Sequence, residues 1–229
     1  MGCAATKDEI NKEEHCIILG EESLSYTTKN CKDVDNIHRK YSFSGNVNNL
    51  QFSEISKRLY LAIYVSPSEK IRNFYNFFKT DEENYSLFSL LVLGLLVSSG
   101  NPIDKARILF EIEDKLSGKI LSRESVQNLA KEMITISVDY LPSLFLTNEE
   151  YKVNEDSVKE YLSKIKQNKD KALGLMTKEF MGGEAKEIKL VDFLNNFRVD
   201  ETAKLLRPHF IRKFVLQNMK TMEELTGSN

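Results

Sequence analysis

Short helical patterns alternate with polar breaks from residue 31 onward, and this alternation is the strongest constraint on the fold. Apolar residues recur at helical spacing in Leu50–Tyr64, Tyr85–Ser98 and Ile103–Ile112. The 229 residues include only 10 glycines and 4 prolines, so few turns are forced on the backbone. No strand–helix–strand alternation occurs. We therefore predict an all-α fold in which a helix–loop–helix unit is repeated about four times.

Composition shifts along the chain suggest three regions. Residues 1–30 are polar without sustained periodicity, and we expect a flexible tail there. Residues 31–138 form a first helical region and residues 139–229 a second one. Ser66-Pro67-Ser68-Glu69 predicts a helix start with Ser66 as its N-cap, whereas Asp139–Asn154, which contains Pro142, predicts an irregular connector.

Charge and cysteine usage narrow the class of protein. The formal net charge of −2 argues against nucleic acid as a partner. Cys3, Cys16 and Cys31 all lie near the start, so a disulfide framework is excluded and a reducing compartment is expected. The longest apolar run, Leu87–Val97, is far shorter than the roughly 20 residues that cross a bilayer. With no secretory signal at the polar N-terminus, we expect a cytoplasmic protein.

The first residues fit a lipid-attachment pattern. Met1-Gly2-Cys3 followed by Thr6 matches M-G-x-x-x-[ST], in which the Gly2 amine is acylated after loss of Met1. One myristoyl chain holds a membrane only weakly, and Cys3 offers a thiol for palmitate as the second signal. The pattern predicts a peripheral membrane protein carrying myristate and palmitate. A chance Met-Gly start, with Met1 retained, is the alternative.

The loop that begins at Glu113 matches a calcium-binding pattern in part. A 12-residue EF-hand loop has oxygen ligands at positions 1, 3, 5, 7, 9 and 12, and Gly at position 6. With Glu113 at position 1, Gly118 falls at position 6 and Ile120 at position 8. The weak candidate calcium ligands are then Glu113, Ser117, Lys119 and Glu124.

Residues Tyr75–Ala130 resemble the middle of an EF-hand protein of the calcineurin regulatory-subunit and neuronal-calcium-sensor type. Phe77-Phe78 closes one incoming helix, Phe88 begins the outgoing one, and LLVLGLLVSSGNPIDKARILFEIED is similar to the linker and next incoming helix of that group. A myristoylated Met-Gly start is common there too. Residues 31–64 and 155–199 match as outer hands through helix–break–helix pattern and the aliphatics Leu50 and Ile188.

The resemblance implies two EF-hand pairs, with an extra C-terminal helix, and an exposed apolar groove that receives a partner's amphipathic helix. The groove candidates are Phe74, Phe77, Phe78, Phe88 and Leu91. Residues 198–220 carry six Lys or Arg residues and an apolar side. This segment could bind a target or a membrane, but we expect it to pack within its own fold.

The loops depart from the calcium-binding pattern. Lys115 stands at position 3 of the best loop, and the second loop, aligned from Lys79, has Leu90 at position 12. The first, aligned from Phe43, lacks early ligands, and the fourth, from Met181, keeps only Asp192 at position 12. Affinity falls with ligand charge. We therefore expect no cofactor, with Ca²⁺ at Glu113–Glu124 as the weaker alternative.

These observations predict a non-catalytic protein. His15, His38 and His209 are isolated in the sequence, and no nucleophile or phosphate-binding motif occurs. We expect an EF-hand-like adaptor or regulatory subunit, tethered to a membrane, that binds an amphipathic helix of a larger protein. The alternatives are a calcium sensor working through residues 113–124 and a structural component of a cytoskeletal or ciliary assembly.

Overall fold

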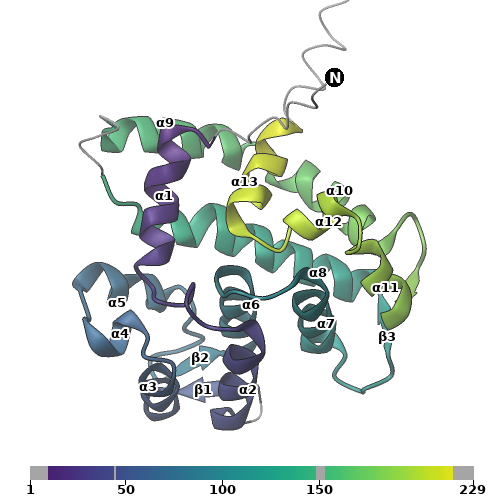
Figure 1. Cartoon of the computed structure of the whole chain (residues 1–229), viewed down its shortest axis with the longest axis horizontal. Helices are drawn as coiled ribbons and strands as arrows, with labels where there is room; N and C mark the ends of the chain where they lie inside the picture. Colours follow the sequence, from purple (N-terminus) through teal and green to yellow (C-terminus); the bar gives the residue numbers. More distant parts are fainter. Residues whose placement is uncertain (1–9, 44, 148–152, 219–229) are drawn as a thin grey trace, which may run out of the picture.

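A computed structural model describes residues 10–43, 45–147 and 153–218. The described chain is mostly helical, which confirms the all-α prediction (Figure 1). In chain order the elements are α1 (Lys12–Glu22), α2 (Cys31–Tyr41), β1 (Asn46–Asn48), α3 (Asn49–Arg58), α4 (Ala62–Val65), α5 (Glu69–Asn76), β2 (Asn84–Ser86), α6 (Leu87–Val97), α7 (Pro102–Glu113), β3 (Ile120–Ser122), α8 (Arg123–Thr135), the π-helix η1 (Ile136–Tyr140), the 3₁₀-helix η2 (Leu141–Leu144), α9 (Glu155–Lys166), α10 (Lys169–Met181), β4 (Glu187–Lys189), α11 (Leu190–Asn196), α12 (Asp200–Lys204) and α13 (Pro208–Gln217).

Two very short sheets join the helix–loop–helix units in pairs. β1 pairs antiparallel with β2, placing Val47 opposite Tyr85. β3 pairs in the same way with β4, placing Leu121 opposite Ile188. These four central residues are buried, whereas none of the strand residues beside them is, because successive side chains of a strand point to opposite faces.

An outgoing helix begins directly after each strand, and three of the four starts carry a side-chain cap. Asn48 accepts a hydrogen bond from the Gln51 backbone N–H, Ser86 from Ser89, and Ser122 from Ser125. These acceptors satisfy backbone donors that the first helical turn leaves unpaired. α11 follows Lys189, whose side chain has no acceptor.

The prediction of a flexible tail over residues 1–30 is wrong from Lys12 onward. α1 begins at Lys12, and Cys16, Ile17, Leu24 and Tyr26 have no exposed surface. The buried side of α1 also carries charged residues, so its apolar periodicity is weak in the sequence. Residues 1–9, with the proposed lipid sites Gly2 and Cys3, lie outside the described residues.

Two local predictions need correction. The helix expected to start after Ser66 starts two residues later, because Ser68 caps α5 by accepting the Ile71 N–H. The helix expected over residues 50–64 divides into α3 and α4, and Tyr60 between them has a left-handed φ of 51°.

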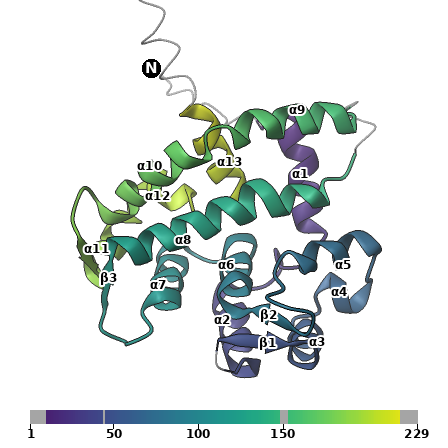
Figure 2. The ribbon, with the colours of Figure 1, turned by 180° about the vertical axis from the view of Figure 1, so that it is seen from behind.

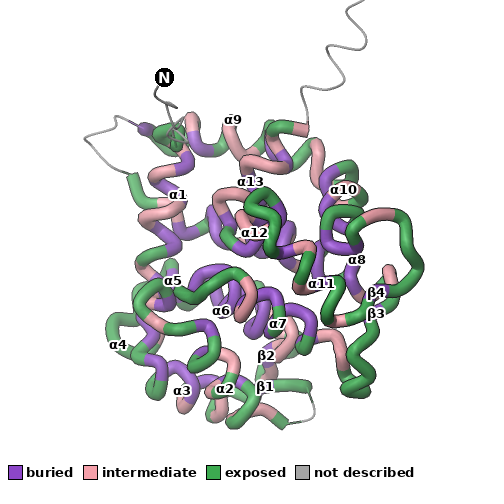
Figure 3. The backbone as a smooth tube through the Cα atoms, turned by 45° about the vertical axis from the view of Figure 1, so that its right-hand side comes forward, coloured by how far each residue is buried: buried purple, intermediate pink, exposed green. Residues whose placement is uncertain are grey.

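α8 crosses the middle of the molecule (Figure 2). The first strand pair and its helices lie on one side, and α9, α10 and α13 lie on the other (Figures 1 and 2). Because β3 pairs with β4, the boundary expected between residues 138 and 139 falls inside one structural unit. The main hydrophobic cluster is one contiguous core, whose members range from Leu24 to Val215 in the sequence. Most of α6 is buried, and it runs through this core (Figure 3).

Candidate functional site

The loop between α7 and β3 is shifted by one residue from the predicted frame. Leu121, not Ile120, is the buried strand residue, and Ile120 is 47% exposed. The Asp114 carboxylate accepts the backbone N–H groups of Gly118 and Lys119, each at 2.9 Å. Lys119 takes the left-handed turn with φ 57° that the sequence assigns to Gly118. The frame therefore runs from Asp114 to Ser125.

This shift changes the candidate ligand set. Glu113 is the last residue of α7 and Glu124 lies exposed in the first turn of α8, while Ser117 and Lys119 are exposed loop residues. Burial raises the pKa of Glu113, and Lys115 opposes this. Within residues 10–43, 45–147 and 153–218, no group of three or more His, Cys, Asp or Glu residues could hold a metal ion.

The loops are instead closed by their own side chains. Asp81 accepts the backbone N–H groups of Glu83 and Asn84, and these bonds lower the pKa of its carboxyl. With the buried strand residues Val47, Tyr85 and Leu121 at position 8, the last position of the first three loops falls at Gln51, Ser89 and Ser125, not at the residues assigned from the sequence. An EF-hand has a bidentate Glu at this position, whereas here the side chain bonds back to the N-cap residue. The Gln51 side chain accepts the Asn48 N–H, and hydroxyl–hydroxyl contacts join Ser89 to Ser86 and Ser125 to Ser122.

The two aliphatic residues assigned to the first and fourth loops lie in different environments. Ile188 is buried at the centre of β4, as expected. Leu50 is 83% exposed on α3, and Val47 occupies the buried strand position instead. The fourth loop is held by Glu184, which pairs with Arg123 at 2.8 Å and Lys178 at 3.2 Å. Asp192 lies exposed on α11.

The predicted groove residues do not form an open apolar groove. Phe74, Phe78 and Leu91 are buried, and Phe88 is half-buried. Phe77 is the exposed member, and its ring stacks on Tyr140 with centroids 4.8 Å apart. Tyr140 also packs edge-on against Phe78. The connector formed by η1 and η2 therefore covers part of the surface that the sequence assigns to a partner.

α13 packs within its own fold, as expected. It contacts α8, η1, α9 and α10. Its buried face carries Ile211, Arg212 and Val215, none of which has exposed surface, while Gln217 is exposed. We call the faces of α8, η1, α9 and α10 that contact it the α13-binding surface.

A buried charge cluster joins α1 to α13. Arg212 Nε donates to Glu14 Oε1 and Oε2 at 2.9 and 3.1 Å, and Nη1 lies 2.8 Å from Glu21 Oε1. Nη1 also donates to the Ser137 carbonyl of η1 at 2.8 Å, and Tyr161 Oη donates to Glu14 at 2.9 Å.

The pKa values of Glu21 and Arg212 are shifted in this buried cluster. Burial raises the pKa of Glu21, and the charge of Arg212 opposes it. Burial disfavours the Arg212 cation, but the two carboxylates outweigh burial and raise its pKa. This cluster was not predicted from the sequence, although an arginine between Ile211 and Val215 on an apolar helix face was a visible signal.

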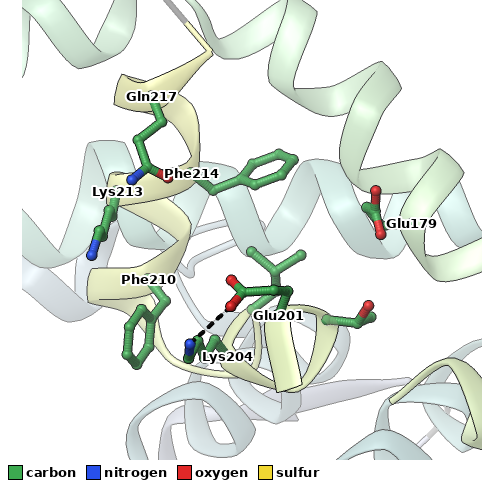
Figure 4. Close-up of a pocket in the computed structure, with 9 residues that line it drawn as sticks. Glu179, Glu201, Lys204, Phe210, Lys213, Phe214 and Gln217 are labelled. Carbon is green, nitrogen blue, oxygen red and sulfur yellow. Dashed lines mark hydrogen bonds and ion pairs between the residues drawn. The ribbon is translucent and has the colours of Figure 1, made fainter. Parts of the chain in front are cut away.

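One cavity lies beside α13, between it, α10 and α12 (Figure 4). Its volume is about 380 Å³, and Phe210 and Phe214 line it. Lys204 in its wall is already paired with Glu201 at 3.0 Å and Asp200 at 2.8 Å. The cavity thus borders α13 without offering an unpaired Lys204 cation.

Comparison with the known protein families finds none that matches this chain. Comparison with curated proteins likewise finds no similar sequence. No helix of the described chain combines the length and apolar character needed to cross a membrane.

Proposed function

We propose that this chain is a non-catalytic, EF-hand-like adaptor or regulatory subunit that binds an amphipathic helix of a larger protein. The docking of α13 is the observation that carries the proposal. An amphipathic helix with buried Ile211 and Val215 already occupies the α13-binding surface. Helix-in-groove recognition uses this kind of apolar face, with anchors three or four residues apart.

The pairing of the loops supports the EF-hand-like architecture. α2–β1–α3 pairs with α5–β2–α6, and α7–β3–α8 pairs with α10–β4–α11, each through one short antiparallel sheet. The Asp81 and Asp114 carboxylates accept backbone N–H groups, so these loops have internal partners for the charges that an ion would otherwise neutralise. We infer that the scaffold keeps its shape without calcium.

The cluster around Arg212 defines the chemistry of the partner. A helix that replaces α13 must supply a cation for Glu14 and Glu21, because unpaired buried carboxylates are costly. The matching partner sequence is an apolar residue followed by Arg, then a second apolar residue three positions later. This is the pattern of Ile211, Arg212 and Val215.

A labelled peptide of residues 205–218 tests the proposal by fluorescence anisotropy. The Val215→Ala variant weakens the resident helix, and we expect it to bind the peptide more tightly than the wild type does. Gln217→Ala alters an exposed residue of the same helix and should behave like the wild type. A peptide carrying Arg212→Leu should not bind. Absence of binding to any receptor, or equal binding of both peptides, would contradict the proposal.

Membrane tethering is a separate part of the proposal and rests on the Gly2 and Cys3 pattern. Two acyl chains provide the anchoring that one chain lacks. The intact mass of the protein from its native cell decides this point. A mass without Met1 and with added acyl groups supports the tether, whereas a retained Met1 removes it.

A further inference from the structure

A second cavity lies where α1, α6, α7 and α13 meet, and its volume is about 380 Å³. Its wall includes Glu21 and Glu22 from α1, residues 96–100 at the end of α6 and beyond, and Lys105 from α7. Arg207, Pro208 and His209 complete it from the start of α13. The cavity therefore contacts both loop pairs, through α6 and α7, and the helices α1 and α13.

Lys105 is a buried cation in this wall. Lys105 is 4% exposed, and within the described chain its Nζ donates only to the carbonyl oxygens of Leu96 and Leu206, at 3.3 and 3.4 Å. No carboxylate forms an ion pair with it within the described ranges. An ammonium has three donors, and a buried charge without a counter-ion is unfavourable. Burial lowers the pKa of Lys105 to about 8, and Arg207 acts in the same direction while Cys31 opposes it.

Ser98 supplies an independent sign of a ligand. The residue is 6% exposed and lines the cavity, and its Oγ has no hydrogen-bond partner among the residues that the structure describes. A buried hydroxyl without a partner is uncommon and calls for an explanation. An oxygen atom of a ligand in the cavity would accept the hydrogen bond that Ser98 lacks.

Four charged side chains line the wall, the cations Lys105 and Arg207 and the carboxylates Glu21 and Glu22. Arg207 is exposed at the cavity, and it forms no ion pair with a carboxylate of the described chain. Glu21 lies 2.8 Å from Arg212, which also pairs with Glu14, so one cation is shared by two carboxylates there. Glu22 is exposed at the rim, where water screens it. His209 and the amino-terminal turn of α13 also face the cavity, and a helix amino terminus carries partial positive charge.

We propose that this cavity binds the phosphate group of a phosphate monoester. Lys105 and Arg207 provide the cationic contacts, and Ser98 Oγ donates to a phosphate oxygen. The cavity has room for a small organic group beside the phosphate. Because the wall comes from α1, α6, α7 and the start of α13, the bound anion links the two loop pairs to α1 and α13. The site needs α13 in its docked position, because Arg207, Pro208 and His209 line it, but it does not need α13 to be exchangeable.

Calorimetric titration of the full chain with glycerol phosphate and with inorganic phosphate tests the site. We expect saturable binding by the wild type, weakened by about 10- to 100-fold in Lys105→Met, which loses a charged hydrogen bond. Ser98→Ala should weaken binding by a smaller factor. Lys115→Met removes an exposed loop lysine outside the cavity and should leave binding unchanged.

Thermal unfolding without phosphate shows whether each variant is folded. Lys105→Met should fold, because it removes a buried cation that lacks a counter-ion. A melting temperature that phosphate raises in the wild type and in Ser98→Ala, but not in Lys105→Met, supports the site. If Lys105→Met does not fold, the affinity of Ser98→Ala for glycerol phosphate is the deciding measurement. A Ser98→Ala affinity equal to that of the wild type would then overturn the proposal.

A binding experiment with lipid vesicles distinguishes a phosphate monoester on a lipid headgroup from one in solution. Vesicles of phosphatidylcholine with phosphatidic acid present the group on a lipid, whereas glycerol phosphate presents it in solution. Lys105-dependent binding to glycerol phosphate assigns a soluble ligand, and Lys105-dependent binding to the vesicles alone assigns a lipid headgroup. Binding to neither, or binding that Lys105→Met leaves intact, overturns the proposal.

Discussion

Arg212 donates hydrogen bonds to Glu14 and to the Ser137 carbonyl from a site without solvent exposure. It therefore ties α13 to α1 and to η1 through one side chain. A buried ion pair adds little stability compared with a well-packed apolar core, but breaking it leaves uncompensated charge. At the scale of residues, this cluster fixes which helix face can lie on the α13-binding surface.

Arg212→Leu should lower the free energy of unfolding by about 3 to 5 kcal/mol, because Glu14 and Glu21 then remain buried without a cation. Chemical denaturation measures this loss. Adding Glu14→Gln and Glu21→Gln should recover part of it. Arg198→Leu changes an exposed arginine and should cost less than about 1 kcal/mol. Equal losses in the two arginine variants would contradict the role of the cluster.

His38 gives a second prediction at this scale. Burial lowers its pKa from 6.5 to about 4, opposed by the contact of Nδ1 with the Val34 carbonyl. The unfolded chain takes up a proton near pH 6.5, but the folded chain does so only near pH 4. Stability is therefore present above pH 6.5 and is lost as pH falls toward 4, by up to about 3 kcal/mol.

His38→Leu should flatten this part of the stability profile, measured by denaturation at a series of pH values. Its absolute stability can change through packing, but the slope between pH 6.5 and 4 should decrease. An unchanged slope would assign the acid sensitivity to other groups.

At the scale of elements, the loops show why sequence patterns located the units but misplaced their frames. Apolar periodicity and the breaks between helices identify the four units correctly. Gly118 suggested the sharp turn, yet Lys119 takes it because Asp114 accepts two successive backbone N–H groups there. The Leu50 assignment failed because the capping box of Asn48 and Gln51 fixes the start of α3 and leaves Val47 in the strand.

The loops should therefore keep their structure in the absence of calcium. We expect equal melting temperatures in calcium and in a chelator, and no calorimetric heat from calcium binding. Asp114→Ala should lower the free energy of unfolding by about 1 to 2 kcal/mol, because two backbone donors lose their acceptor. Glu124→Gln, at an exposed helix position, should change neither result. Micromolar calcium binding abolished by Glu124→Gln would establish the calcium-sensor alternative instead.

At the scale of the whole molecule, local sequence patterns do not show which helices pack against one another. The tail prediction failed because Glu14 and Glu21 face the interior of the protein and hide the buried side of α1. The groove prediction failed because η1 and η2 extend α8 over Phe77 and Phe78. Both predictions failed on contacts between residues that are far apart in the sequence. Local sequence patterns carry no information about such contacts.

The central claim is that α13 is an exchangeable occupant of a helix-binding surface. Amide hydrogen exchange of the wild type, with and without excess peptide of residues 205–218, tests it most directly. We predict that the peptide speeds exchange of the backbone amides of the resident α13, while α6 in the core stays protected. Unchanged protection of α13 at saturating peptide would contradict the account.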